Sequence, residues 1–200
     1  MNFKSFFSAL ATRHWKELGR FWRNNKWERT DDGGILVGFA RISGVYECEA
    51  PDGFGIQTSN NLLTTEGCNY LLSVGVAGGT QYSTFYVAPF GGNVAVADTL
   101  SAANFATTQT ELTNSHYSET TRVAFVESIP AAKSTNNTAS PATITAATTN
   151  VNVYGLGLLS TSTKSATTGI LLSAVNYSPV RSLAAVGDTL GIKYTLTLSN

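Results

Sequence analysis

The sequence predicts a mainly β protein: an antiparallel β-sandwich or jelly roll with one short internal helix, preceded by an N-terminal amphipathic α-helical arm. Only 13% of the 200 residues are charged and 42% are hydrophobic, and the abundant Thr, Val and Tyr favour pleated, half-buried strands. After residue 33, short alternating runs are separated by turn signals, which is typical of a sandwich or barrel. The first 30 residues have a different composition. We therefore expect an arm, residues 1–32, and one β-domain, residues 33–200.

The arm has the periodicity of a helix. Between residues 3 and 23, apolar side chains recur in steps of three, four and seven, which predicts one wide apolar stripe on an α-helix. We expect the helix to end at Asn24-Asn25 and a loop to follow at residues 31–34. Because a short helix is marginal in water, its stripe must bury against its own domain, a partner protein or a membrane surface.

The arm also concentrates charge and aromatic residues. Residues 1–30 hold all three tryptophans and seven of the thirteen Lys and Arg, against two Glu, which gives this segment a charge of +5 in a chain of formal net charge zero. A basic end on a neutral body is typical of an interaction arm, and aromatic and Arg side chains are frequent interface anchors. The predicted partner-binding residues are Phe3, Phe7, Leu10, Trp15, Leu18, Arg20, Phe21, Trp22 and Trp27.

The first part of the β-domain predicts strand, turn and helix. Residues 35–50 contain one or two strands, in which Tyr46, Cys48 and Ala50 alternate with Val45, Glu47 and Glu49, and residues 51–53 predict a turn. A short helix is expected within residues 58–80. Thr64 or Thr65 would cap it, with Glu66 in its first turn. Leu71 and Leu72 would pack inward, and Gly78-Gly79 would end it.

Short strands account for the rest of the chain. They are expected at residues 83–91, 120–128, 169–177 and 188–198, with two more within 142–161, and Pro89 and Gly91-Gly92 are expected to end the first. The last strand has strict period two, which indicates a half-buried antiparallel strand. Its predicted inner face is Leu190, Ile192, Tyr194, Leu196 and Leu198. The polar residues 131–142 predict a long exposed loop.

Residues for catalysis or metal binding do not group in the sequence. His116 lies among Ser115, Ser118 and Glu119, but neighbours in sequence do not make a catalytic triad, and a surface or interface histidine is expected. Acidic residues are scattered, and no glycine pattern matches a phosphate-binding loop. We expect no enzymatic activity, no cofactor and no metal.

Other features limit the partners. Two cysteines, Cys48 and Cys68, are too few for a disulfide scaffold; buried free thiols are favoured, and a single bridge remains open. No apolar run is long enough to span a membrane. Nucleic-acid binding is not expected, because the aromatic residues follow a helical stripe and the β-domain has no basic patch.

Several motifs then occur in a fixed order: NLLTTEGCNYLL (61–72), GGTQYSTFYVAPF (78–90), HYSETTRVAF (116–125), KSATTGILLSAVNYS (164–178) and GDTLGIKYTLTLS (187–199). This order resembles a group of tailed-bacteriophage accessory virion proteins, over about three quarters of the chain. The resemblance implies a β-rich structural role in a virion assembled in the host cytoplasm. The arm is not part of the shared pattern.

Two structural hypotheses follow from this resemblance. In the first, the chain is a capsid decoration, or cement, protein whose arm reaches a major capsid protein or a sister copy in a homo-oligomer. In the second, it is a tail adaptor or tail-fibre base component whose arm binds tail or portal proteins. A hypothesis of another class is a glycan-binding surface module using the aromatic residues Tyr82, Phe85, Tyr86 and Phe90, although such a run is more typical of a strand core.

Overall fold

The computed structural model describes residues 41–199, which are mainly β, with ten strands and two helices. The prediction of a mainly antiparallel β chain is confirmed, and the choice between sandwich and jelly roll remains a prediction. Residues 43–197 form one compact unit. The predicted arm, residues 1–32, and the boundary to the β-domain lie outside the described residues. So do all nine predicted partner-binding residues: Phe3, Phe7, Leu10, Trp15, Leu18, Arg20, Phe21, Trp22 and Trp27.

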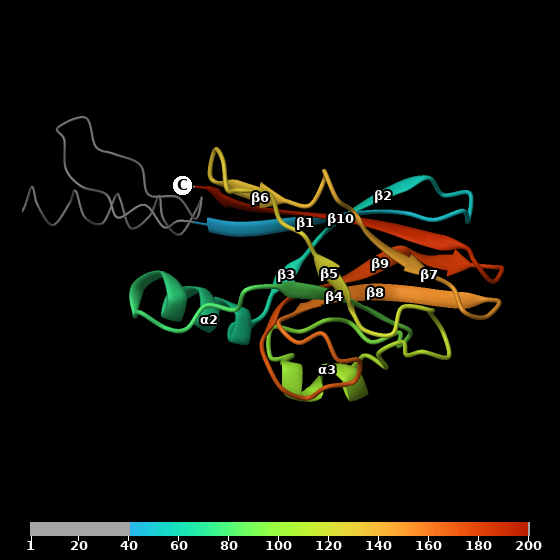
Figure 1. Ribbon diagram of the computed structural model, residues 1–200, viewed down its shortest axis with the longest axis horizontal. Coiled ribbons are helices and arrows are strands. Elements are labelled where there is room, and N and C mark those ends of the chain that lie inside the picture. The colour runs from blue at the N-terminus through green and yellow to red at the C-terminus, as the bar shows by residue number, and fades with distance from the viewer. Residues whose placement is uncertain (1–40, 200) are drawn as a thin grey trace, which may run out of the picture. The chain divides into compact units, whose positions relative to one another are not determined.

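The strands form two sheets (Figure 1). The first sheet has the order β2 (Ile56–Asn60), β1 (Arg41–Glu49), β10 (Thr189–Ser199) and β6 (Ser134–Asn136), and β7 (Ala142–Thr145) also pairs with β10. The second has the order β3 (Leu62–Leu63), β9 (Leu171–Leu183), β8 (Val151–Leu159), β4 (Phe85–Phe90) and β5 (Val123–Phe125). The β8–β9 pair runs from Val151 opposite Leu183 to Leu159 opposite Leu171, so these two long strands form the middle of the second sheet.

The alternation predicted for two strands is confirmed. In β1, Tyr46 and Cys48 are buried while Glu47 and Glu49 are exposed. In β10, the first three residues of the predicted inner face, Leu190, Ile192 and Tyr194, are buried. The same face then rises out of the core, because Leu196 is half-buried and Leu198 is 42% exposed.

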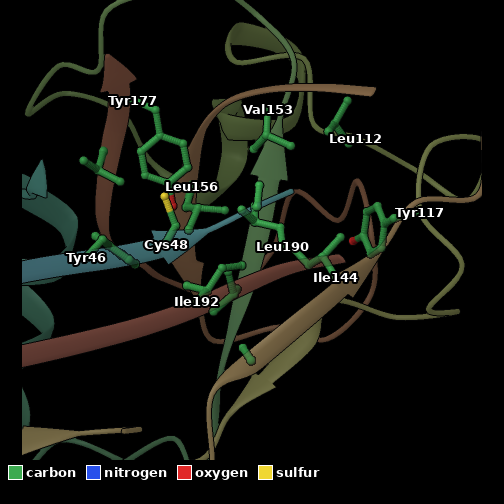
Figure 2. Packing of buried hydrophobic residues seen from close by; sticks show 14 of the residues in the cluster. Tyr46, Cys48, Leu112, Tyr117, Ile144, Val153, Leu156, Tyr177, Leu190 and Ile192 are labelled. Carbon is green, nitrogen blue, oxygen red and sulfur yellow. The ribbon is translucent and has the colours of Figure 1, made fainter. Parts of the chain in front are cut away.

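One cluster of buried side chains draws on both sheets. Figure 2 shows Tyr46 and Cys48 of β1 and Ile192 of β10 among Val153 and Leu156 of β8. A second, smaller cluster joins helix α3 (Ala102–Thr108) to the second sheet through side chains including Phe105, Phe90 and Leu171. The second sheet is therefore covered on both faces, which explains why β8 is buried almost continuously rather than in alternation.

Helix α2 (Thr65–Val76) forms where the sequence predicts it. The Thr64 hydroxyl caps it by accepting from the Gly67 N–H at 2.9 Å, and Gly78 follows its end with a φ of +69°. The prediction that both leucines pack inward is wrong for Leu72, which is 62% exposed, whereas Leu71 packs against the main core. Neighbouring helical residues are about 100° apart around the axis, so the inward face runs through residues 67, 71 and 74 and leaves Leu72 outside.

Other expectations need correction as well. Helix α3 is not predicted from the sequence, because it is short and buries only Ala102 and Phe105. Pro89 does not end β4 but pairs with Leu156 inside it. β4 pairs with β5 only through Phe85–Val87. Pro89 lies beyond this stretch, so its missing N–H removes no hydrogen bond between β4 and β5.

The expected loop at residues 131–142 contains strand β6 and a buried asparagine. The Asn137 side chain accepts from the Tyr194 N–H at 2.7 Å and donates to the Ile192 carbonyl at 3.1 Å. The side-chain amide of Asn137 thus makes the two hydrogen bonds to β10 that the backbone of a neighbouring strand would otherwise make. Both cysteines are free thiols, as favoured from the sequence. The expectation that both are buried is confirmed for Cys48 and wrong for Cys68, which is exposed on α2.

Candidate functional site: the groove and the cleft beside α2

The NLLTTEGCNYLL motif holds α2 against the second sheet. The Glu66 carboxylate accepts from the Ala102 N–H at 2.8 Å and from the Leu171 N–H at 2.7 Å, so it joins the start of α3 to β9. Gly67 allows the helix to approach closely, since a Cβ at this position would lie 2.1 Å from the Leu172 carbonyl oxygen. Glu66 and Gly67 therefore have a structural role: they fix α2 against the second sheet.

Asn61, from the same motif, ties the first sheet together. Its side-chain oxygen accepts from the Gly44 N–H at 2.8 Å, and its amide nitrogen donates to the Tyr194 hydroxyl at 2.8 Å. A Cβ on Gly44 would lie 2.4 Å from that hydroxyl, so this contact requires glycine.

A buried ion pair joins Glu111 to Arg122. Two hydrogen bonds of 2.8 Å connect the guanidinium and the carboxylate, and both side chains are fully shielded from solvent. The Arg122 guanidinium also donates to the Thr161 carbonyl at 2.9 Å, and the Ser165 N–H donates to Glu111 at 3.0 Å. The carboxylate is thus fully engaged and is not free to act as a base.

Lys164 lies next to this pair. Its ammonium group is 3.3 Å from the centroid of the Tyr117 ring and donates to the backbone carbonyls of Tyr117 and Glu119. Burial lowers the pKa of the Lys164 amine, and the charges of Glu119 and Glu111 oppose that shift. The half-buried His116 side chain accepts from the Thr113 N–H at 3.3 Å and lies 3.1 Å from Ser115 Oγ, and its backbone carbonyl accepts from the Ala147 N–H at 2.9 Å.

A second buried pair closes the β1–β2 turn. Arg181 binds Asp52 at 2.9 Å and the Gly55 carbonyl at 2.7 Å, while its Nε and Nη1 atoms have no hydrogen-bond partner among the described residues. Cys48 and Tyr177 lie nearby in the core (Figure 2). Burial raises the pKa of the Cys48 thiol, so this cysteine is held as the neutral thiol.

Beside α2 the surface is hollowed by an apolar groove of about 440 Å³. Its wall consists of Tyr70, Leu71 and Val74 from α2, together with residues of both sheets such as Phe125 and Leu196. Among its lining residues the only Asp, Glu, Lys, Arg or His is Glu127. This chemistry suits apolar side chains and does not suit a charged substrate.

An open cleft of about 720 Å³ lies next to the groove and shares Tyr70 and Tyr82 with it. The cleft is lined by the N-terminal part of α2 and by the residues that lead into α3, up to its N-cap Ser101. The polar lining residues include Asn69 on α2, and Asp98 and Thr99 before α3. The cleft therefore combines aromatic and polar groups.

The predicted aromatic run does not form one exposed platform. Phe90 is fully buried and Phe85 and Tyr86 are half-buried in β4, whereas Tyr82 is 41% exposed. Tyr82 lines both the groove and the cleft, and the partly buried Phe85 lines the groove. The sequence prediction missed Tyr70, which α2 brings to Tyr82 from 12 residues away.

Comparison of the chain with protein-family models, curated proteins and solved structures finds no match. Within residues 41–199, no group of three or more His, Cys, Asp or Glu side chains is arranged to hold a metal ion. In the same part of the chain, neither helix has the length and apolar character needed to cross a bilayer.

Proposed function

We propose that this chain is a non-enzymatic structural component of a bacteriophage virion, a capsid decoration or cement protein anchored by its N-terminal arm. We interpret the two sheets and their shared core as a β-sandwich. The proposal is supported by the five ordered motifs that resemble accessory virion proteins, which span about three quarters of the chain.

One observation carries the proposal: several residues of the motifs hold the domain together. Glu66 joins α3 to β9, and Arg122 forms a buried ion pair. Gly187, with a φ of +89°, allows the turn before β10. Motif residues of this kind stabilise the fold of the domain. A stable fold of defined shape is what a structural protein needs in order to fit into a capsid lattice.

The arm supplies the anchor in this proposal. Its tryptophans and arginines are residue types that dominate the energetics of interfaces, and an arm adds contact area without altering the domain. The proposed partners are the major capsid protein and sister copies of the chain. The low content of charge fits a protein whose sides are covered by neighbours.

The alternative is a tail adaptor or a tail-fibre base component, in which the arm binds tail or portal proteins. Copy number separates the two. A decoration protein follows the capsid lattice and is present in hundreds of copies, whereas a tail component follows a ring and is present in about six to eighteen. Mass-resolved counting of this chain in purified particles decides between them.

The role of the arm is tested by deletion of residues 1–30. We expect the shortened chain to stay folded and soluble, with the β-sheet circular dichroism of the full chain, and to be lost from particles purified by density gradient. The matched control is the full-length chain with Lys4→Ala and Lys26→Ala, which lowers the charge but keeps the apolar stripe. Normal incorporation of the shortened chain contradicts anchoring, and failure to fold would show that the arm belongs to the domain core.

A further inference from the structure

We propose that the cleft beside α2 binds a neutral saccharide, with the Tyr82 ring as its apolar wall and Asn69, Asp98 and Thr99 as its hydrogen-bonding groups. This inference does not depend on the structural role proposed above, because the arm takes no part in it. Of the aromatic run Tyr82, Phe85, Tyr86 and Phe90, it uses only the exposed Tyr82 as a binding surface, because Phe90 is buried and Phe85 and Tyr86 are half-buried.

Tyr82 is held in place although its side chain faces solvent. Its backbone N–H donates to the Tyr70 hydroxyl at 2.9 Å, and the two rings lie 5.5 Å apart at 43°. Tyr70 in turn packs edge-on against Phe85, with ring centroids 5.6 Å apart. A fixed and exposed aromatic face offers an apolar surface to the C–H groups of a sugar ring.

The polar groups of the cleft are free to bind a ligand. Asn69, Asp98 and Thr99 are exposed, and within residues 41–199 their side chains have no hydrogen-bond partner. An asparagine amide both donates and accepts, and a carboxylate only accepts. Because each sugar hydroxyl also donates and accepts, an amide and a carboxylate near one aromatic face complement a pair of neighbouring hydroxyls.

The charge of the cleft selects among ligands. Glu66 and Asp98 line it, and neither Lys nor Arg does. A phosphate, a nucleic acid or an acidic sugar would meet uncompensated negative charge. A neutral saccharide has no such penalty, and the open rim lets the cleft take part of a longer glycan chain.

The cleft is preformed, and its geometry favours binding over cleavage. The Thr65 N–H donates to the Asp98 carbonyl at 2.8 Å, which fixes the loop before α3 against the start of α2. The Glu66 carboxylate accepts from two backbone N–H groups. This engagement makes it a positioning group rather than a catalytic acid. A preformed site avoids the cost of ordering its groups on binding.

The test uses the full chain, neutral oligosaccharides of glucose, galactose, mannose and N-acetylglucosamine, and an array that also carries acidic glycans. We expect at least one neutral glycan to bind and its ring protons to show saturation transfer in NMR. Tyr82→Ala and Asn69→Ala should each weaken binding about tenfold or more, and Tyr82→Phe should retain most of it. Asn114→Ala, an exposed asparagine outside the cleft, is the matched control and should bind as the unaltered chain does.

Three outcomes overturn the proposal. One is the absence of binding to every neutral glycan. Another is binding that is unchanged in both Tyr82→Ala and Asn69→Ala, which places the site elsewhere. The third is a preference for acidic glycans, which contradicts the charge argument. Thermal unfolding of each variant confirms that it is folded, because all the substituted side chains lie at least partly exposed on the surface.

Discussion

Buried arginines are the residue-scale feature that most constrains this chain. Arg122 and Arg181 are fully buried, and each is paired with an acidic side chain. Removing a charge from water costs several kcal/mol, which a well-oriented partner offsets only when the remaining donors and acceptors are also bonded. The Glu111–Arg122 pair meets that condition, whereas two nitrogens of Arg181 have no hydrogen-bond partner within residues 41–199.

The pair between Glu111 and Arg122 therefore gives a clear stability prediction. Glu111→Ala should lower the free energy of unfolding by about 3–5 kcal/mol, because it leaves a buried guanidinium without its counter-charge. The measurement is urea unfolding followed by circular dichroism. Glu127→Ala, at an exposed acid, is the control and should change stability by less than about 0.5 kcal/mol.

A double variant separates the charge from the packing. Replacing the pair with apolar residues, Glu111→Leu and Arg122→Met, should recover most of the stability lost in Glu111→Ala, because no charge then remains buried. If Glu111→Ala unfolds at the same urea concentration as the unaltered chain, the buried pair is not a stabilising contact.

The sequence could not reveal this pair. Glu111 and Arg122 are 11 residues apart, and the segment between them is neither one helix nor one strand, so no regular period brings their side chains together. By sequence they look like scattered surface charges. They meet only because the loop between α3 and β5 folds back, and a loop has no periodicity from which such a return could be predicted.

At the scale of the element, α2 depends on one glycine. Gly67→Ala would place a Cβ 2.1 Å from the Leu172 carbonyl oxygen of β9. The clash could be relieved only by moving the backbone of α2 or of β9. We expect a loss of stability of about 1–3 kcal/mol or more. Gly75→Ala in the same helix meets nothing within 4 Å and should stabilise the chain by about 0.5–1 kcal/mol.

These two variants are matched, since they change the same residue type in the same helix. Thermal unfolding by calorimetry should move their melting temperatures in opposite directions. Equal shifts would mean that α2 does not pack against β9 as described, because helix propensity alone treats both positions alike.

The sequence predicts those elements whose structure is determined by residues close together in the chain. A cap at Thr64 or Thr65, the alternation in β1 and two strands within residues 142–161 are all predicted from the sequence, and the structure places the cap at Thr64. Helix α3 and strand β6 were not, because one is seven residues long and the other three. Segments of that length have too few turns or alternations to show a period, and their tertiary contacts determine their structure.

At the scale of the whole molecule, sheet order was beyond prediction. A period of two shows which residues share a face and does not show which strands pair. β10, near the end of the chain, lies beside β1, and β3 pairs with β9 more than 100 residues later. The cleft has the same origin. Tyr82 was a candidate from the sequence, but the groups from α2 and from the loop before α3 join it only through the fold.

The tyrosines of the core give the whole molecule a dependence on pH. Burial raises the pKa of Tyr194 to about 12 and holds the pKa of Tyr46 and Tyr177 well above its usual value. In the unfolded chain each phenol ionises near pH 10. The folded state therefore keeps protons that the unfolded state loses, so the stability is complete below about pH 10 and falls as the pH rises through 12.

Urea unfolding measured from pH 7 to 12 tests this dependence. Each buried tyrosine should contribute a slope of about −1.4 kcal/mol per pH unit above pH 10. The lowered pKa of Lys164 acts in the opposite direction, because it makes stability rise with pH up to the ordinary lysine value. Tyr194→Phe isolates the phenol: it should lower stability at pH 7 by about 1 kcal/mol, since Asn61 loses its acceptor, and make the alkaline slope shallower. A profile that is flat to pH 12, or a slope unchanged in Tyr194→Phe, would mean that the phenols are not shielded between the two sheets.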